Sequence, residues 1–268
     1  MRKWRIDSSL ALTGLGWLGV AFLLLPIVIA VAVSFDPGDR LAFPPTGFSL
    51  RWYYNLFSNT QWSEPLLRSS LFGLASSAIA VSAGTAGAYG LIHLTRGRLL
   101  LLAIFVLPLL IPPVVLAVGQ YFWLARFGLI DNWLGLVMAH AVITFPIALI
   151  FTIVPLSRGG LRSEDIACSL GARRWYAFMR VTLPGLFPSL VAATLLSFIT
   201  AFDETVLSLF LTSYKAKTLP RQMFEGLKYN LDPTMAAVAG LAVMFWSILL
   251  LLALFFRRER SLIDKDFR

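Results

Sequence analysis

Long apolar runs alternate with short polar segments along almost the whole chain. A helix that crosses the hydrocarbon core of a bilayer needs about 20 mainly apolar residues. Six segments have this length and composition: residues 10–34, 66–94, 99–124, 132–156, 185–211 and 233–256. The pattern therefore predicts an all-α, polytopic membrane protein with six transmembrane helices in a single transmembrane domain, residues 1–268.

Prolines inside these predicted spans indicate where the helices bend. Each proline removes a backbone N–H donor, but neighbouring helices and waters can satisfy the freed carbonyls inside a membrane protein. We therefore expect kinks rather than helix ends at the interior prolines, which are Pro26, Pro108, Pro112, Pro113 and Pro146.

Composition supports a membrane protein, because 58% of the residues are hydrophobic, 14% are charged and the mean hydropathy is +0.77. The net charge of +9 comes from basic residues scattered over loops that flank the predicted spans, so it does not indicate nucleic-acid binding. Cys168 is the single cysteine, which excludes an internal disulfide. His93 and His140 have no metal ligands at helical spacing, so no metal site is expected.

The basic residues also predict an orientation. The first apolar run follows Arg2, Lys3 and Arg5 and is too long for a typical signal peptide, so we interpret it as a retained helix. Placing the N-terminus inside puts most of the 23 Lys and Arg residues in the cytoplasm. Both termini and the loop 157–184 are then cytoplasmic. The basic residues of the last outer loop run against this rule: Lys215, Lys217, Arg221 and Lys228.

The loop 157–184 has the signals of a short amphipathic helix. Ser163 is a suitable N-cap, and Glu164 and Asp165 would lie in the first turn, where carboxylates favour the helix dipole. Gly171 is placed to end the helix in a left-handed conformation. Ile166 and Leu170, four residues apart, would give the helix one apolar face. From these residues alone, an ordinary solvated cytoplasmic loop with an amphipathic helix is the favoured interpretation.

The run Glu164 to Ala172, followed by Leu183-Pro184, resembles the EAA loop of binding-protein-dependent ABC importer permeases of the type I fold. The resemblance implies that the protein lies in the bacterial inner membrane. It also implies that 157–184 is a cytoplasmic coupling loop whose helix docks on an ATPase subunit. It differs at Asp165-Ile166-Ala167, where Glu-Ala-Ala is usual, so that the larger Ile166 stands in place of an alanine. The residues implied to contact the ATPase are Glu164, Asp165, Ile166, Ala167, Leu170 and Gly171.

A second set of residues resembles the spermidine/putrescine permeases, in particular their PotC-like subunits. It comprises Ser197 to Thr205 with its Phe-Asp-Glu sequence, Leu219-Pro220, and Met223 to Gly226. Permeases for other nitrogenous or phosphonate solutes have similar residues, so these substrates remain alternatives. The resemblance implies half of a polyamine pathway, completed by a PotB-like permease, two PotA-like ATPases that use ATP and Mg, and a PotD-like periplasmic binding protein.

Asp203 and Glu204 interrupt an otherwise apolar run. An acid exposed to lipid costs a few kcal/mol, so each side chain should face protein or a water-filled cavity. Measured from Pro184 at about 1.5 Å per residue, Asp203 would lie in the outer half of the membrane. Both are therefore candidates for the substrate pathway, where negative charge would attract a polycation. The alternative is structural: an ion pair, or a cap at a broken span.

The predicted periplasmic loop 35–65 carries aromatic residues around Arg51: Trp52, Tyr53, Tyr54, Phe57 and Trp62. Aromatic rings can bind alkylammonium groups, but such residues more often mark a helix at the membrane interface. In the resembling family this loop lies near the docked binding protein, which makes Trp52 a third pathway candidate.

No catalytic function is expected of this chain. It has no phosphate-binding GxxxxGK[ST] sequence, so ATP must be hydrolysed by a partner and no cofactor should bind here. Small residues at Gly84-Thr85-Ala86-Gly87 indicate close helix packing instead. Two other classes stay open: an ion-driven carrier working alone, for which a second half is missing, and a membrane enzyme or scaffold, for which a catalytic cluster is missing.

Overall fold

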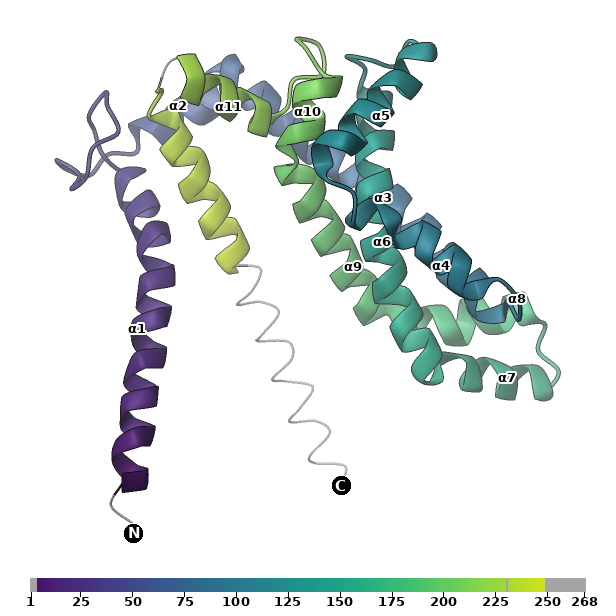
Figure 1. Ribbon diagram of the computed structural model, residues 1–268. Helices are drawn as coiled ribbons and strands as arrows, with labels where there is room; N and C mark the ends of the chain where they lie inside the picture. The colour runs from purple at the N-terminus through teal and green to yellow at the C-terminus, as the bar shows by residue number, and fades with distance from the viewer. Residues whose placement is uncertain (1–3, 230, 249–268) are drawn as a thin grey trace. The chain divides into compact units, whose positions relative to one another are not determined.

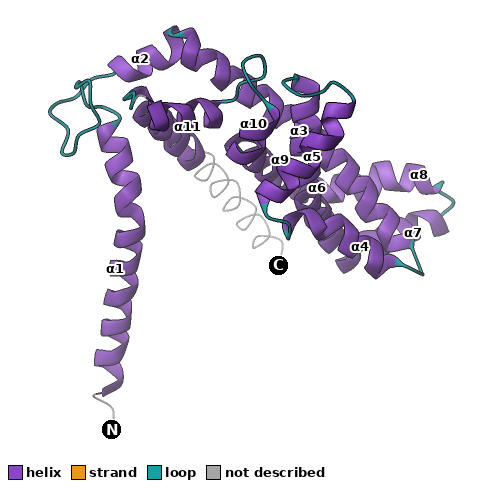
Figure 2. Cartoon of the chain, turned by 45° about the horizontal axis from the view of Figure 1, so that its top comes forward, coloured by secondary structure: helices purple, strands orange, loops and turns teal. Residues whose placement is uncertain are grey.

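The computed structural model describes residues 4–229 and 231–248, and the regular elements in that part of the chain are all helical (Figures 1 and 2). Two compact units are present. The first joins the chain up to Ser63 to the chain from Glu225 onward, and the second is Glu64–Phe224. The elements are α1 (Trp4–Val33), α2 (Arg51–Ser58), α3 (Thr60–His93), α4 (Arg98–Val106), η1 (Leu107–Leu109), α5 (Pro113–Arg126), α6 (Trp133–Pro155), η2 (Leu156–Gly160), α7 (Leu161–Ser169), α8 (Arg174–Ala177), η3 (Phe178–Thr182), α9 (Leu183–Asp203), α10 (Thr205–Leu211), α11 (Leu219–Tyr229) and a helix at Thr234–Ile248.

Four helices in the described part are long and apolar enough to cross a membrane: Leu12–Ser34, Thr60–His93, Trp133–Gly159 and Arg174–Asp203. They confirm the predicted spans at 10–34, 66–94 and 132–156 as helices. The predicted span at 233–256 forms the helix Thr234–Ile248 over its described part, and its remainder lies outside the described residues. The count of six spans and the cytoplasmic termini stay predictions.

The predicted span at 99–124 is not one continuous helix. It consists of Arg98–Leu109 and Pro113–Arg126, which are bent by 100° at a short break. Pro112 has an extended backbone with φ −54° and ψ 135°. Two consecutive prolines lack the N–H groups that would continue the helix, and their rings clash with the preceding turn. The expected kink is therefore a sharp turn, and the bent pair counts as at most a fifth span.

The second unit is organised around α6, which packs along α9 (Figure 1). One apolar cluster joins residues of α5, α6 and α10, including Leu124, Leu136 and Leu207. Another lies at the opposite end of α6 and includes Leu149, Leu156 and Leu186. The loop that carries α7 begins and ends next to this second cluster. The packing of α6 and α9 therefore fixes the positions of both ends of the loop.

Gly84 lets α3 approach α6 closely. A Cβ atom at Gly84 would lie 2.8 Å from the Ala148 Cβ atom and 2.8 Å from the Leu149 backbone nitrogen. A Cβ at Gly87 would lie 3.2 Å from Leu149 Cδ1. Small residues at such positions permit backbone contact between membrane helices. The interpretation of the Gly84 to Gly87 run as a packing surface is thereby confirmed.

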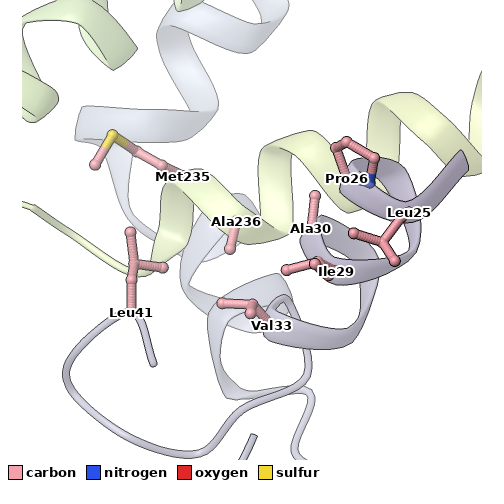
Figure 3. Close-up of a pocket in the computed structure, with 8 residues that line it drawn as sticks. All are labelled: Leu25, Pro26, Ile29, Ala30, Val33, Leu41, Met235 and Ala236. Carbon is pink, nitrogen blue, oxygen red and sulfur yellow. The ribbon is translucent and has the colours of Figure 1, made fainter. Parts of the chain in front are cut away.

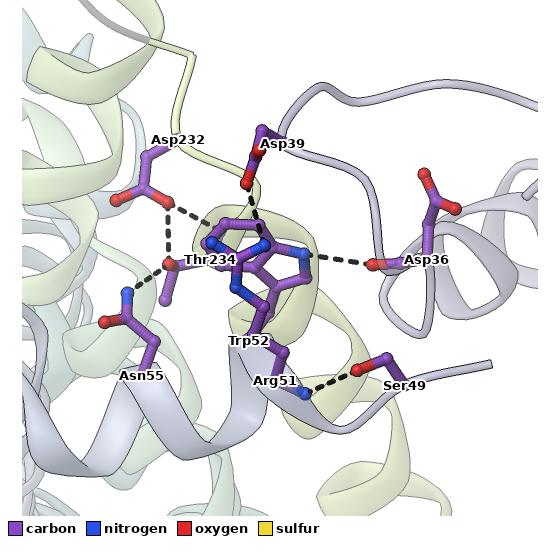
Figure 4. Close-up of polar contacts among 8 residues, drawn as sticks. All are labelled: Asp36, Asp39, Ser49, Arg51, Trp52, Asn55, Asp232 and Thr234. Carbon is purple, nitrogen blue, oxygen red and sulfur yellow. Dashed lines mark hydrogen bonds and ion pairs between the residues drawn. The ribbon is translucent and has the colours of Figure 1, made fainter. Parts of the chain in front are cut away.

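In the first unit, α2 is joined to the start of the helix Thr234–Ile248 by polar contacts (Figure 4). The Asn55 Nδ2 group donates to Thr234 Oγ1 at 2.7 Å. Trp62 Nε1 donates to Asp232 Oδ2 at 2.9 Å, and the other oxygen of Asp232 accepts from the Thr234 backbone N–H at 2.8 Å. Asp232 therefore caps this helix and holds Trp62 at the same time.

An apolar groove of about 480 Å³ lies between α1 and the helix Thr234–Ile248 (Figure 3). It is lined by aliphatic side chains of both helices and of the loop after α1. Its lining residues are Leu25, Pro26, Ile29, Ala30, Val33, Leu41, Met235 and Ala236. Such a surface suits the hydrocarbon interior of a bilayer.

Candidate functional site

The predicted coupling loop forms a helical hairpin at the end of α6 and α9 (Figure 1). The backbone leaves the α6 direction at Gly159, continues as α7, reverses near Gly171 and returns through α8 and η3 to α9. Gly171 has φ +94°, which confirms its predicted left-handed conformation. The prediction of Ser163 as N-cap is wrong, because α7 begins at Leu161 directly after η2 and Ser163 lies inside the helix.

Glu164 is turned toward the protein interior and is only 1% exposed. Its Oε1 atom accepts a hydrogen bond of 2.5 Å from the Tyr89 hydroxyl of α3. Its Oε2 atom accepts one of 2.7 Å from the Thr182 hydroxyl at the end of η3. Arg174 Nε lies 3.9 Å from Oε1. The structure therefore places Glu164 away from the outer surface of α7, with one hydroxyl donor on each carboxylate oxygen.

The outer side of α7 and the turn directly after it carry the predicted apolar face, because α7 ends at Ser169 and Leu170 is the next residue. Ile166 is 62% exposed and Leu170 is 85% exposed. Asp165 is also exposed, with its carboxylate 4.0 Å from Arg174 Nη2, whereas Ala167 is half-buried. Single exposed apolar residues are common on protein surfaces, but solvation of a loop does not require two large aliphatic side chains on one face. The face formed by Ile166 and Leu170 is thus a candidate contact for another protein.

The predicted span at 185–211 breaks at the two acidic candidates. Helix α9 ends at Asp203, Glu204 is extended, and α10 starts at Thr205. Glu204 Oε1 accepts from the backbone N–H groups of Val206 at 2.9 Å and Leu207 at 3.2 Å. This is the geometry of a helix cap at a broken span, which was the structural alternative for this residue.

Asp203 differs from its neighbour, because its side chain is exposed and its carbonyl oxygen accepts from the Thr205 hydroxyl at 3.3 Å. An exposed acid at the end of an apolar helix has free lone pairs for a cation. The predicted pathway role is thus best supported for Asp203, while for both acids it stays a prediction.

Trp52 is buried against its own chain. Its Nε1 group donates to the Asp36 carbonyl oxygen at 3.0 Å, and the Arg51 guanidinium lies 4.6 Å from the centre of its ring (Figure 4). An internal cation therefore already occupies the surface that was predicted to meet substrate. Tyr54 and Phe57 of the same helix are exposed, as in an interfacial helix. The pathway role of Trp52 stays a prediction.

Asp131 is a structural residue that the sequence analysis did not single out. Its carboxylate accepts from the backbone N–H groups of Ser213 at 2.7 Å and Ala216 at 3.2 Å, in the loop after α10. Burial alone raises the pKa of Asp131, but hydrogen bonds from the N–H groups of Ser213, Ala216, Lys215 and Tyr214 outweigh it and hold the pKa below the ordinary value. Its position between two predicted spans was the available signal.

Metal ligands are not gathered anywhere in the part of the chain that the structure describes, where no three His, Cys, Asp or Glu side chains lie close enough to share an ion.

Residues 76–262, which include the whole coupling loop, match the family of binding-protein-dependent transport system inner membrane components. The chain belongs to this family. It is an inner-membrane permease of an ABC importer. Over 242 residues, covering 90% of this chain and 94% of the relative, it is 26% identical to the spermidine/putrescine transport system permease protein PotC of Haemophilus influenzae.

A relative with another substrate name is similar to the same extent. The chain is 29% identical over 247 residues to the trehalose transport system permease protein SugB of Mycobacterium tuberculosis, covering 89% of this chain and 90% of that protein. Among solved structures, a bacterial ABC transporter involved in the import of the acidic polysaccharide alginate superimposes with a TM-score of 0.69, at 15% identity, over 96% of this chain and 98% of that one. This likeness shows the permease fold.

Proposed function

We propose that this permease forms half of the membrane pathway of a polyamine importer. We also propose that the α7 face of Ile166 and Leu170 contacts an ATPase subunit and is displaced when that subunit moves. The observation that carries the proposal is the exposure of this aliphatic pair, at 62% and 85%, on a short helix between two apolar helices. Its position in the family match supports an ATPase as the partner.

In the proposed cycle, a periplasmic binding protein delivers the solute to the permease, and two ATPase subunits close when they bind ATP. The α7 hairpin transfers that closure to α6 and α9, because it is built directly on their ends. A second permease subunit, PotB-like in this proposal, completes the pathway. ATP and Mg act in the PotA-like ATPase, and this chain supplies binding surfaces without a cofactor.

A polyamine is the proposed substrate class because the acidic Asp203 is exposed at the end of α9, and because the chain is similar to PotC over nine tenths of its length. A cationic solute gains from a carboxylate in a low-dielectric passage. The similarity to SugB favours a neutral sugar as the second candidate. A sugar would not depend on the charge of Asp203, which separates the two.

The α7 contact is tested by the double substitution Ile166→Ser with Leu170→Ser. Burying a large aliphatic side chain contributes about 1.5–3 kcal/mol, so losing two should weaken ATPase binding by roughly 100-fold or more. We expect the ATPase subunit to be lost during purification of the complex and solute uptake to fall with it. The permease itself should keep its thermal stability, because both side chains are exposed in the free chain.

The matched control is Leu227→Ser, another exposed leucine, on α11 outside the coupling loop. It should leave ATPase retention unchanged. If the double variant retains the ATPase as firmly as the unmodified chain does, α7 is not the contact.

A further inference from the structure

Glu164 and Asp165 are adjacent acids in α7 with opposite surroundings. The side chain of Asp165 is 67% exposed, and that of Glu164 is 1% exposed. A buried carboxylate is costly unless its oxygens are hydrogen-bonded. The hydrogen-bond partners of the Glu164 carboxylate must therefore explain why it can be buried.

The two oxygens of Glu164 are bound by different parts of the chain. Tyr89, which binds Oε1, is 75 residues earlier and lies in the last turns of α3. Thr182, which binds Oε2, is 18 residues later and directly precedes α9. Each oxygen has one hydroxyl donor at 2.5–2.7 Å, within the range of strong bonds to a charged acceptor. The carboxylate thus joins three elements with one group.

The surroundings of this joint are packed. The Tyr89 ring meets the Phe178 ring of η3 edge to face, with ring centres 4.6 Å apart. Phe178 in turn stacks on Trp175 at 6.0 Å. Ala88 and Leu91, on either side of Tyr89, belong to the apolar cluster that includes Leu186 of α9. A swing of α7 about this point would leave a buried carboxylate unsatisfied.

We infer that Glu164 is a positioning residue that makes α7 move as one body with the ends of α3 and α9. This inference rests on the proposed contact between α7 and the ATPase. In it, Ile166 and Leu170 receive the displacement, and the bonds from Glu164 to Tyr89 and Thr182 carry it into the two long helices. Asp165, on the exposed side of α7, has no part in this step.

The test uses Glu164→Gln, which keeps the size of the side chain but removes its charge and one acceptor oxygen. The complete transporter is reconstituted in nanodiscs, and amide hydrogen exchange is compared with and without ATP and vanadate. In the unmodified transporter, nucleotide should change exchange in α7 and also in residues 86–93 and 183–190. In Glu164→Gln, the response of α7 should persist and the response of the two helix ends should fall roughly 2- to 30-fold.

Two further variants define the origin of any effect. Tyr89→Phe removes a single hydroxyl and should give an intermediate loss at residues 86–93, and it serves the same purpose where Glu164→Gln reduces assembly. Glu64→Gln makes the same chemical change at an exposed i,i+4 ion pair of α3, which is worth little, and should leave all responses unchanged.

The outcomes separate the inference from the function on which it rests. Equal responses of the helix ends in Glu164→Gln and the unmodified transporter, with α7 still responding, would overturn the positioning role alone. An α7 that ignores nucleotide in the unmodified transporter would overturn the proposed contact and the inference with it.

Discussion

Asp203 and Glu204 are adjacent acids at a helix break, and their carboxylates have different surroundings. The Glu204 carboxylate accepts hydrogen bonds from the N–H groups of Val206 and Leu207, whereas the Asp203 side chain is exposed. Hydropathy alone indicated that both should avoid lipid, and it could not distinguish the cap from the free acid. The distinction depends on where the backbone leaves the helix, which is set by the fold.

Substituting the two acids separately tests their roles. Asp203→Asn should lower putrescine and spermidine uptake by about tenfold, because a fixed negative charge raises the local concentration of a cation, and it should leave thermal stability unchanged. Glu204→Ala should instead cost about 1 kcal/mol of stability through loss of the cap. Uptake assays and thermal unfolding of the purified complex measure both effects. Full polyamine uptake by an assembled Asp203→Asn transporter would favour the neutral-solute alternative.

Asp131 predicts a pH-dependent contribution to stability. Because its pKa is lowered in the folded protein, its stabilising effect is present above the ordinary value of 3.8 and is lost as the pH falls through the lowered value. At neutral pH, Asp131→Asn should reduce the free energy of unfolding by about 0.5–1 kcal/mol, since the half-exposed carboxylate is partly screened. Thermal unfolding in detergent should show this difference closing below pH 3.8. A difference that persists in acid would contradict this account.

At the scale of elements, the presence of α1, α3 and α6 could be predicted from the sequence, because each contains an apolar run of membrane-spanning length. The starts of α1 and α3 could not, since both helices begin six residues before the predicted spans, at Trp4 and Thr60. The sharpness of the bend at the predicted kink Pro112-Pro113 could not be predicted. Composition stays apolar across Pro112-Pro113, so prolines indicate a bend without giving its angle of 100°. The site was predicted in the same partial way: the apolar face of α7 follows from four-residue spacing, but the burial of Glu164 depends on Tyr89, far away in the chain.

The contact between α3 and α6 gives a prediction with an internal control. At Gly84→Ala, the new methyl group would meet Ala148 and the Leu149 backbone at 2.8 Å, and overpacking of this kind costs about 1–3 kcal/mol. Gly90→Ala lies in the same helix with nothing within 4 Å, so it should be neutral or slightly stabilising. Thermal unfolding of the two variants in the same detergent compares them directly. Equal stability of both would show that the helices separate easily.

At the scale of the whole molecule, similar chains with the same fold are named for different solutes. The alginate importer shares the fold at 15% identity, and relatives named for a polyamine and for a sugar are similar over nearly the full chain. The arrangement of helices therefore cannot specify the solute. Specificity must come from individual side chains along the pathway, and Asp203, which we propose to be one of them, is the first to substitute.

The first unit is assembled from the two ends of the chain, and this has a consequence for biogenesis. Trp62 obtains its acceptor from Asp232, and Asn55 pairs with Thr234. During translation, the early segment is in the membrane long before these partners leave the ribosome. Trp62 and Asn55 therefore lack these hydrogen-bond partners until translation has passed Thr234. Quality control of a truncated product could thus recognise an early segment that never acquires its late partner.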